Sequence, residues 1–432
     1  MQHNVSIITI GDELLIGQVI DSNSAWMAQQ LNIAGLSVKR RVAVGDVADE
    51  IWSALDEESK HADIILLTGG LGPTADDITK PVLCRYFNGT MVVDEKVLAH
   101  VKYLFEQVYR RPGPILERNL KQAEVPDTCT VLANQRGSAP GMWFEKNGLI
   151  FVSMPGVPHE MQGIMTEEVI PRLAAAFTLP YIVHRTLVTV GVGESMIAEK
   201  IKDFELTLPS HIRLAYLPNY SMVRLRLSGS GKEKMVIEKE IDDLFTELQL
   251  QVKEYMVTNK DERMEQVVAR LLLERGQTVT SAESCTGGYI AHLLTTEGGA
   301  SAFFEGSIIS YSYQAKENLL HVKATTLNKF GAVSEETVRE MVTGALEQLK
   351  TTYAIAVSGI MGPGGATPDK PVGTVWIAVG NNEKTVTQKM HFRFDRLRNI
   401  QLTAMNALNM LRQLILTLPG DKSSGVEEIA EV

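Results

Sequence analysis

One local pattern occurs twice in this chain of 432 residues: an apolar run, a small hydroxyl residue, and then Gly-x-x-Gly-Pro. The first copy begins at Thr68, after the run 63–68, and the second begins at Ser358, after the run 354–357. A continuous apolar run that ends in such a turn is typical of a strand buried on both faces of an α/β sheet. Ligands of such sheets bind at the carboxyl ends of the strands. The chain is therefore expected to contain two α/β domains, each with a glycine-rich site.

The segment between the two copies has a different texture. Its strand-like segments alternate polar and apolar residues, and two helical patterns accompany them, which predicts a small α+β module. We therefore predict two α/β domains with mainly parallel or mixed sheets, joined by this module. The expected boundaries are 1–178, 179–258 and 259–418. The tail 419–432 combines Pro, Gly and Ser with acidic residues and is expected to be disordered.

Composition narrows the class of protein. Lys and Arg number 42 and Asp and Glu number 52, so the net charge is 42 − 52 = −10, which disfavours a general nucleic-acid binder. No apolar run reaches the ~18 residues that a membrane span needs, and the N-terminus lacks the layout of a signal peptide. The three cysteines include no Cys-x-x-Cys pair, which argues against a disulfide framework. A cytoplasmic enzyme is the expectation.

The first glycine-rich loop has the features of a phosphate site. Glycines at the end of a strand allow backbone N–H groups to approach phosphate oxygens. Two aspartates follow at once, and carboxylates beside a pyrophosphate are unfavourable unless a divalent cation bridges the two. The alternative is a tight turn followed by an acidic helix start. The predicted phosphate loop comprises Thr68, Gly69, Gly70, Gly72 and Thr74. The candidate metal ligands are Asp12, Asp76 and Asp77, with Glu13 and Glu160 as weaker candidates.

In the last third, hydroxyl groups and N–H groups gather at a predicted helix start. Ser284, Thr286 and Gly287 lie there and favour an anion or a developing oxyanion. Cys285 beside them is either a nucleophile of lowered pKa or a small buried residue.

A second set of residues offers a nucleophile and a base. A partly desolvated lysine can activate a serine, so Ser301, Tyr311 and Lys316 are candidates for a catalytic set. The alternative is that all three are ordinary surface residues, because spacing does not establish contact.

The second glycine-rich loop contains four glycines within seven residues, and three arginines follow it in the run 393–398. The loop is expected to hold phosphate, with an entropically costly surface loop as the alternative. Arginines can bind phosphate bidentately, although the cluster also suits a solvated strand edge. The candidate substrate residues are Ser358, Gly359, Gly362, Gly364, Gly365 and Arg398.

Taken together, these motifs resemble the CinA family across essentially the whole chain. The resemblance is carried by Ile10-Gly-Asp-Glu-Leu-Leu15, Thr68 to Asp77, Met154-Pro-Gly-Val-Pro-His-Glu160, Ala282-Glu-Ser-Cys-Thr-Gly-Gly288 and Ser358 to Gly365. It implies an N-terminal domain like molybdopterin-binding domains, a KH-like module, and a C-terminal domain that deamidates nicotinamide mononucleotide without a cofactor. A homodimer is expected.

The resemblance also implies roles for individual residues. In the deamidase, Ser301 looks like the nucleophile, Lys316 the base and Tyr311 its hydroxyl partner. Ser284 and Ser358 look like substrate-site hydroxyls and Arg398 looks like a phosphate or ribose clamp. The family usually has Thr where this chain has Ser358, which keeps the hydroxyl.

For the N-terminal domain, the resemblance implies hydrolysis of ADP-ribose or a related dinucleotide with Mg²⁺, Mn²⁺ or Co²⁺. A pterin- or nucleotide-binding module without turnover is the first alternative. A partner protein in competence or DNA repair is the second. Because the middle module lacks a clear Gly-x-x-Gly clamp, nucleic acid is an unlikely ligand.

Overall fold

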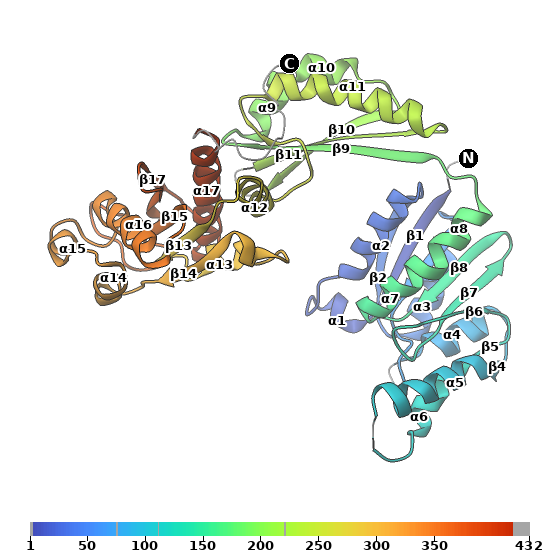
Figure 1. Ribbon diagram of the computed structural model, residues 1–432. Coiled ribbons are helices and arrows are strands. Elements are labelled where there is room, and N and C mark those ends of the chain that lie inside the picture. The colour runs from blue at the N-terminus through green and yellow to red at the C-terminus, as the bar shows by residue number, and fades with distance from the viewer. Residues whose placement is uncertain (1–2, 75–76, 111, 220–221, 418–432) are drawn as a thin grey trace. The chain divides into compact units, whose positions relative to one another are not determined.

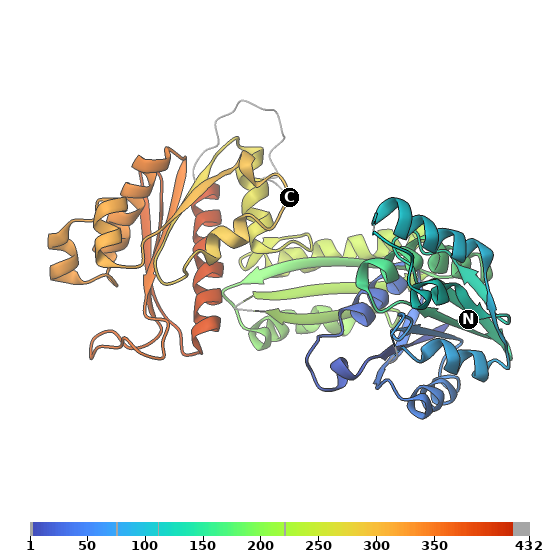
Figure 2. The ribbon, with the colours of Figure 1, turned by 90° about the horizontal axis from the view of Figure 1, so that it is seen from below.

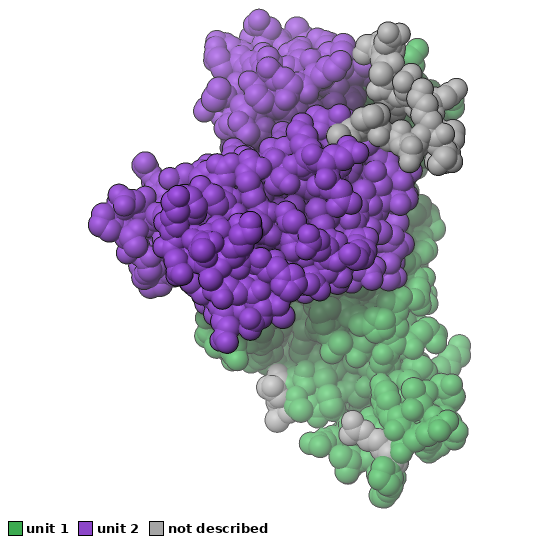
Figure 3. Space-filling view, turned by 60° about the vertical axis from the view of Figure 1, so that its left-hand side comes forward, with its two compact units in different colours: residues 1–184, 208–213, 227–245 green, residues 185–207, 214–226, 246–432 purple. Residues whose placement is uncertain are grey.

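The computed structural model describes residues 3–74, 77–110, 112–219 and 222–417 (Figure 1), so the predicted tail 419–432 lies outside them. The described chain forms two compact units, coloured separately in Figure 3. One comprises residues 1–184, 208–213 and 227–245, and the other comprises 185–207, 214–226 and 246–432. The division runs through the segment that we predicted as the middle module.

The first unit is built on a six-stranded sheet of order β2-β1-β3-β8-β7-β6, in which β2, β1, β3 and β8 are parallel and β7 and β6 are antiparallel. The strands are β1 (Asn4–Ile10), β2 (Ser37–Val44), β3 (Ile64–Thr68), β6 (Thr130–Leu132), β7 (Gly141–Lys146) and β8 (Leu149–Met154). The helices are α1 (Asp12–Leu15), α2 (Ser22–Ile33), α3 (Ala48–Glu58), α4 (Thr79–Tyr86), α5 (Glu95–Tyr103), α6 (Glu117–Leu120), α7 (Pro158–Ile164) and α8 (Ile170–Ala176). A small antiparallel pair, β4 (Met91–Val93) and β5 (Glu124–Pro126), lies beside α5.

Both faces of this sheet are buried, as the continuous apolar runs predicted. Ile7 of β1 packs with α2 and α7, whereas its neighbour Ile8 packs with α3 and α4. Alternate side chains of a strand point to opposite faces, so a strand covered on both sides is mostly apolar along its whole length. The loops that follow β1, β3 and β8 consequently open at one edge of the sheet.

The middle segment forms a four-stranded sheet of order β10-β11-β9-β12. Its elements are β9 (Tyr181–Val190), α9 (Glu194–Lys200), α10 (Lys202–Thr207), β10 (Ile212–Asn219), β11 (Met222–Gly231), α11 (Lys234–Val252) and β12 (Met256–Thr258). The predicted α+β character is present, although β10 is a strand that the alternation did not reveal.

The C-terminal domain carries a mixed sheet of order β14-β13-β15-β16-β17, with β13 parallel to β14 and β15 and the remaining pairs antiparallel. Helices α12 and α17 pack on one face and α16 packs on the other (Figures 1 and 2). The strands are β13 (Val279–Glu283), β14 (Phe304–Ile309), β15 (Tyr353–Gly359), β16 (Thr374–Gly380) and β17 (Thr385–His391). The helices are α12 (Met264–Glu274), α13 (Tyr289–Leu294), α14 (Tyr313–Leu320), α15 (Ala324–Phe330), α16 (Glu335–Leu349) and α17 (Arg396–Thr417).

The predicted fold class, two α/β domains joined by an α+β module, is confirmed. Within the described ranges, no helix combines the length and the apolarity that crossing a membrane requires.

Candidate functional site

The first glycine-rich loop passes very close to its neighbours. Gly69 and Gly70 have φ values of 118° and 64°, which side chains other than glycine rarely adopt. A Cβ atom at Gly69 would lie 2.2 Å from the carbonyl oxygen of Ile10, and one at Gly70 would lie 2.2 Å from Thr79 Oγ1. These two glycines are therefore required by the close approach of β1 and α4, whatever ligand the loop holds.

The Asp77 side chain accepts hydrogen bonds from the loop to which it belongs. Its carboxylate accepts hydrogen bonds from the backbone N–H groups of Gly72 at 2.7 Å and Thr74 at 2.9 Å, and from the Thr74 hydroxyl. Two N–H groups of the predicted phosphate loop are thus satisfied by a side chain of the same loop. The other predicted aspartate, Asp76, lies outside the described residues. Thr68, at the start of the loop, donates its hydroxyl hydrogen to the carbonyl of Pro155.

The other described candidates for metal ligands contact residues other than Asp77. Asp12 and Asp46 exchange backbone-to-carboxylate hydrogen bonds of 3.2 Å, and the Glu13 carboxylate lies against Gly11. Glu160 accepts a 2.7 Å hydrogen bond from Asn134, and burial raises the pKa of Glu160. Among residues 3–74, 77–110, 112–219 and 222–417, no three His, Cys, Asp or Glu side chains gather as a metal site would require. Because the predicted ligand Asp76 lies outside the described residues, the cation site stays a prediction.

The contacts of Asp77 give a stability prediction. Asp77→Ala leaves two amides of the loop without an acceptor, so we expect unfolding of this domain to lose about 1–2 kcal/mol. That loss corresponds to a lowering of its Tm by roughly 2–8 °C in scanning calorimetry. The exposed Glu106→Ala serves as the charge-matched control. An unchanged transition for Asp77→Ala would mean that the carboxylate does not support the loop.

At the second site, a buried carboxylate organises the helix start that follows β13. Glu283 is completely buried, and it accepts hydrogen bonds from the backbone N–H groups of Gly288, Ile290 and Ala291 at 2.8–3.1 Å. The Thr286 hydroxyl donates to the same carboxylate at 2.6 Å. An acidic side chain suits this position because N–H groups at the start of a helix carry partial positive charge. Glu283 therefore fixes the turn that carries the next residue, Ser284.

Ser284 and Lys316 form a buried pair. Lys316 Nζ lies 2.8 Å from Ser284 Oγ and also donates to the carbonyl oxygen of Ser310 at 2.6 Å. The Lys316 side chain is completely buried, and Ser284 is 8% exposed. Burial lowers the pKa of Lys316 to about 8, because the charged ammonium loses its hydration. A lysine with this pKa, in contact with a serine hydroxyl, can act as its general base.

Cys285 does not share this activation. Burial raises the pKa of its thiol to about 12, so the thiol is protonated at neutral pH. Of the two interpretations of Cys285, the structure supports the small buried residue rather than the nucleophile.

The Ser284 hydroxyl opens into a cavity of about 220 Å³ whose wall includes most of the second glycine-rich loop. Arg396 closes one side by donating to the Gly362 carbonyl at 2.8 Å and to the Tyr311 hydroxyl at 3.3 Å. The cavity is lined by Ser284, Cys285, Tyr311, Ala332, Val333, Ser358, Gly359, Ile360, Met361, Gly362, Gly364, Gly365 and Arg396. The predicted Ser284, Tyr311 and Ser358 and four predicted glycines are thus brought together around the serine–lysine pair.

Four predicted site residues do not line this cavity, and their predicted roles stay predictions. Ser301 is exposed in a short 3-10 turn, and the base that was paired with it contacts Ser284 instead. Thr286 gives its hydroxyl to Glu283, and Gly287, exposed at φ 60°, shapes the turn. Arg398 lies over the ring of Phe394 at 4.2 Å and does not line the cavity.

Sequence reasoning missed three residues that build this site: Glu283, Arg396 and Asn399. Glu283 stands inside the recognised motif, and a carboxylate just before a helix start is a capping signal that pointed to it. Asn399 is buried and donates to the carbonyls of Met361 and Phe394, so it holds the glycine-rich loop against α17. No local pattern reveals this contact.

Comparison with known protein families found matches over three consecutive parts of the chain. Three family descriptions match: "Probable molybdopterin binding domain" over residues 6–175, "Damage-inducible protein CinA KH domain" over 184–258 and "CinA C-terminal domain" over 261–415. They define a three-part protein with a molybdopterin-binding-like first domain and a C-terminal CinA domain.

The relatives are similar over nearly the full length. A CinA-like protein of Cytophaga hutchinsonii is 44% identical over 407 residues, which cover 94% of this chain and 97% of that protein. A CinA-like protein of Flavobacterium psychrophilum is 43% identical over 412 residues, which cover 95% of this chain and 98% of that protein. The chain belongs to the CinA family. A solved CinA superfamily protein from Klebsiella pneumoniae is 36% identical, with a TM-score of 0.35, and covers 36% of this chain and all of that one.

Proposed function

We propose that the C-terminal domain is an amidohydrolase that converts nicotinamide mononucleotide to nicotinate mononucleotide and ammonia. The observation that carries the proposal is the 2.8 Å contact between Ser284 Oγ and the buried Lys316 Nζ. Ser284 also lines a cavity whose wall includes glycines and Arg396. The substrate follows from the family resemblance. The cavity of about 220 Å³ is smaller than the 300–1,000 Å³ typical of a site that encloses a whole ligand, so it suits the carboxamide-bearing ring.

The proposed reaction uses Ser284 as nucleophile and Lys316 as general base. Neutral Lys316 takes the hydroxyl proton while Ser284 Oγ bonds to the carboxamide carbon. Lys316 then returns the proton to the departing nitrogen, which leaves as ammonia, and an ester remains on Ser284. Water then attacks the ester carbon and gives a proton to Lys316. The bond between this carbon and Ser284 Oγ breaks as Lys316 returns the proton to Oγ, and nicotinate mononucleotide is released.

Other groups position Lys316 and the substrate in this scheme. The carbonyl oxygens of Ser310 and Tyr311 hold Lys316 Nζ, so the amine is directed at Ser284 in every step. Arg396 supplies a positive charge at the cavity wall for the nucleotide phosphate.

The depressed pKa of Lys316 predicts a pH dependence. Only the neutral amine is a base, so kcat/KM for nicotinamide mononucleotide should rise with pH and level off above about 8. Below that value, the rate should fall roughly tenfold for each pH unit, because the neutral fraction falls in that proportion. Ammonia release between pH 6 and 9 measures this profile. A flat profile across that range would contradict Lys316 as the base.

A second candidate function belongs to the N-terminal domain. We propose that it binds ADP-ribose or a related dinucleotide at the sheet edge where the loops after β1, β3 and β8 meet. The observation that favours a ligand there is the glycine-rich loop Gly69–Gly72, pinned beside Thr68 and Pro155. The described carboxylates do not gather as a cation site, so we derive no metal-dependent step.

Hydrolysis assays separate the two alternatives for this domain. The full-length chain should be incubated with ADP-ribose in Mg²⁺, Mn²⁺ or Co²⁺, and in EDTA. Release of AMP in any of the three metals supports the pyrophosphatase implied by the family. Binding of ADP-ribose without release would support a binding module without turnover.

A further inference from the structure

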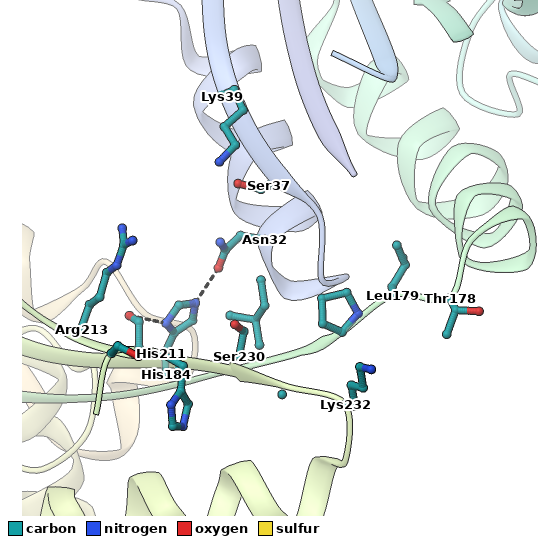
Figure 4. Close-up of a pocket in the computed structure, with 16 residues that line it drawn as sticks. Asn32, Ser37, Lys39, Thr178, Leu179, His184, His211, Arg213, Ser230 and Lys232 are labelled. Carbon is teal, nitrogen blue, oxygen red and sulfur yellow. Dashed lines mark hydrogen bonds between the residues drawn. The ribbon is translucent and has the colours of Figure 1, made fainter. Parts of the chain in front are cut away.

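A polar pocket of about 780 Å³ within the first unit belongs to neither proposed site (Figure 4). Three parts of the chain form its wall. They are the end of α2 with the start of β2, the segment 178–184 that includes the start of β9, and the start of β10 with the end of β11. The lining residues are Asn32, Ser37, Lys39, Thr178, Leu179, Pro180, Ile182, His184, Ser210, His211, Arg213, Ser228, Gly229, Ser230, Gly231 and Lys232.

The ionisable side chains that line this pocket are all basic. It includes Lys39, Arg213 and Lys232 with two histidines, and no Asp or Glu belongs to it. Within the described ranges, none of these three cations forms an ion pair, whereas His211 is paired with Glu240 at 2.8 Å. Unpaired cations that face one cavity, in a chain of net charge −10, create a local field that favours an anion.

The centre of the pocket is held in place by hydrogen bonds. His184 Nε2 donates to Asn32 Oδ1 at 2.5 Å, and Nδ1 lies 2.7 Å from Ser228 Oγ. Figure 4 shows Asn32 and His184 on the side of the pocket away from Leu179, the side on which Arg213 also lies. The lysine and the arginine that line this part of the pocket are groups that bind phosphate oxygens.

The opposite side of the pocket is apolar. Leu179, Pro180 and Ile182 line it and offer a surface for a ring, and Ser230 and Lys232 add polar groups. The two glycines beside them have a packing role, because a Cβ atom at Gly229 would lie 2.9 Å from Ile241 Cδ1. Packing against α11 therefore accounts for both glycines without a ligand.

The chemistry of the pocket favours a small molecule over a nucleic acid. The pocket lining includes no Phe, Tyr or Trp, so successive bases would lack the large aromatic side chains on which they usually stack. Across residues 179–258, 10 Lys and Arg are opposed by 11 Asp and Glu, and no basic stripe extends along the module. A cavity of this volume accommodates one mononucleotide.

We propose that this pocket binds a nucleoside phosphate, with its phosphate against Lys39 and Arg213 and its base against Leu179 and Pro180. The site is independent of both proposed activities.

Hydrogen exchange of the full-length chain, followed by mass spectrometry, tests the proposal with ADP as the probe and EDTA present. ADP should slow exchange in the segments 178–184 and 228–232. The double variant Lys39→Ala/Arg213→Ala should require at least tenfold more ADP for the same effect. The control Lys60→Ala/Arg172→Ala removes the same charge from surface ion pairs and should match the unmutated chain. The variant Lys39→Gln/Arg213→Gln gives the same comparison if the alanine variant unfolds.

Further probes identify the group that is recognised. Pyrophosphate should slow exchange in 228–232, and adenosine without phosphate should not. Absence of any effect of millimolar ADP, or an effect that persists in the double variants, would overturn the proposal. An effect of adenosine but not pyrophosphate would overturn the phosphate assignment. Slowing by a single-stranded RNA oligonucleotide but not by ADP would replace the small ligand with nucleic acid.

Discussion

Replacing Lys316 with alanine is expected to reduce ammonia release from nicotinamide mononucleotide by at least about a thousandfold, while the chain stays folded. Lys316 is the basic side chain that contacts the Ser284 hydroxyl, and no solvent molecule at neutral pH replaces a base of pKa about 8 held at 2.8 Å. Steady-state kcat measures the loss. Lys316→Arg should be as inactive, because its guanidinium stays protonated.

The double variant Ser284→Ala/Lys316→Ala sharpens this test. A nucleophile and its base act as one unit, so the double variant should be about as slow as either single variant. Ser301→Ala is the matched control: it removes an exposed serine hydroxyl of the same domain and should retain close to full activity. Additive losses for Ser284 and Lys316 would contradict the pairing.

Glu283→Ala is expected to lower the free energy of unfolding of the C-terminal domain by about 3–5 kcal/mol. The substitution leaves three backbone N–H groups and the Thr286 hydroxyl without their acceptor, and each buried unsatisfied group costs about 1–3 kcal/mol. We expect the calorimetric transition of this domain to fall by roughly 6–12 °C. Deamidation should fall with it, because Ser284 is the next residue in the chain.

Two variants calibrate this result. Glu283→Gln keeps a carbonyl acceptor in the same place and should lose less stability than the alanine variant. Glu305→Ala removes an exposed carboxylate of the same domain and should leave the transition where it is. A Glu283→Ala domain that unfolds within about 1 °C of the unmutated one would contradict the capping role.

Continuous apolar runs allowed the buried strands to be predicted closely. The run 63–68 corresponds to β3 apart from its first residue, and the run 354–357 is the centre of β15. Strands β10 and β17 were missed because they are partly exposed, so their residues carry neither a continuous apolar run nor a clean alternation.

The catalytic serine shows what spacing cannot supply. Ser301 stands nearer to Lys316 in sequence than Ser284 does, yet the contact depends on the register of two parallel strands. Glu283 of β13 pairs with Ile309 of β14, so Ser284 and Ser310 leave the sheet side by side. Lys316, from the first turn of α14, then points back between them.

The N-terminal loop shows a different limit. The sequence Thr68 to Asp77 suits a phosphate loop and a self-closed acidic turn equally well, because both need glycines and a nearby carboxylate. The contacts of Asp77 with Gly72 and Thr74 follow from the path of the loop, which composition does not determine.

Ammonia release from nicotinamide mononucleotide by the Ser284→Ala variant, beside the unmutated chain in EDTA, tests the central claim most directly. We predict one ammonia for each nicotinate mononucleotide formed by the unmutated chain, and no release above background by Ser284→Ala. Undiminished release by Ser284→Ala, or none by the unmutated chain, would contradict the proposed serine–lysine amidohydrolase.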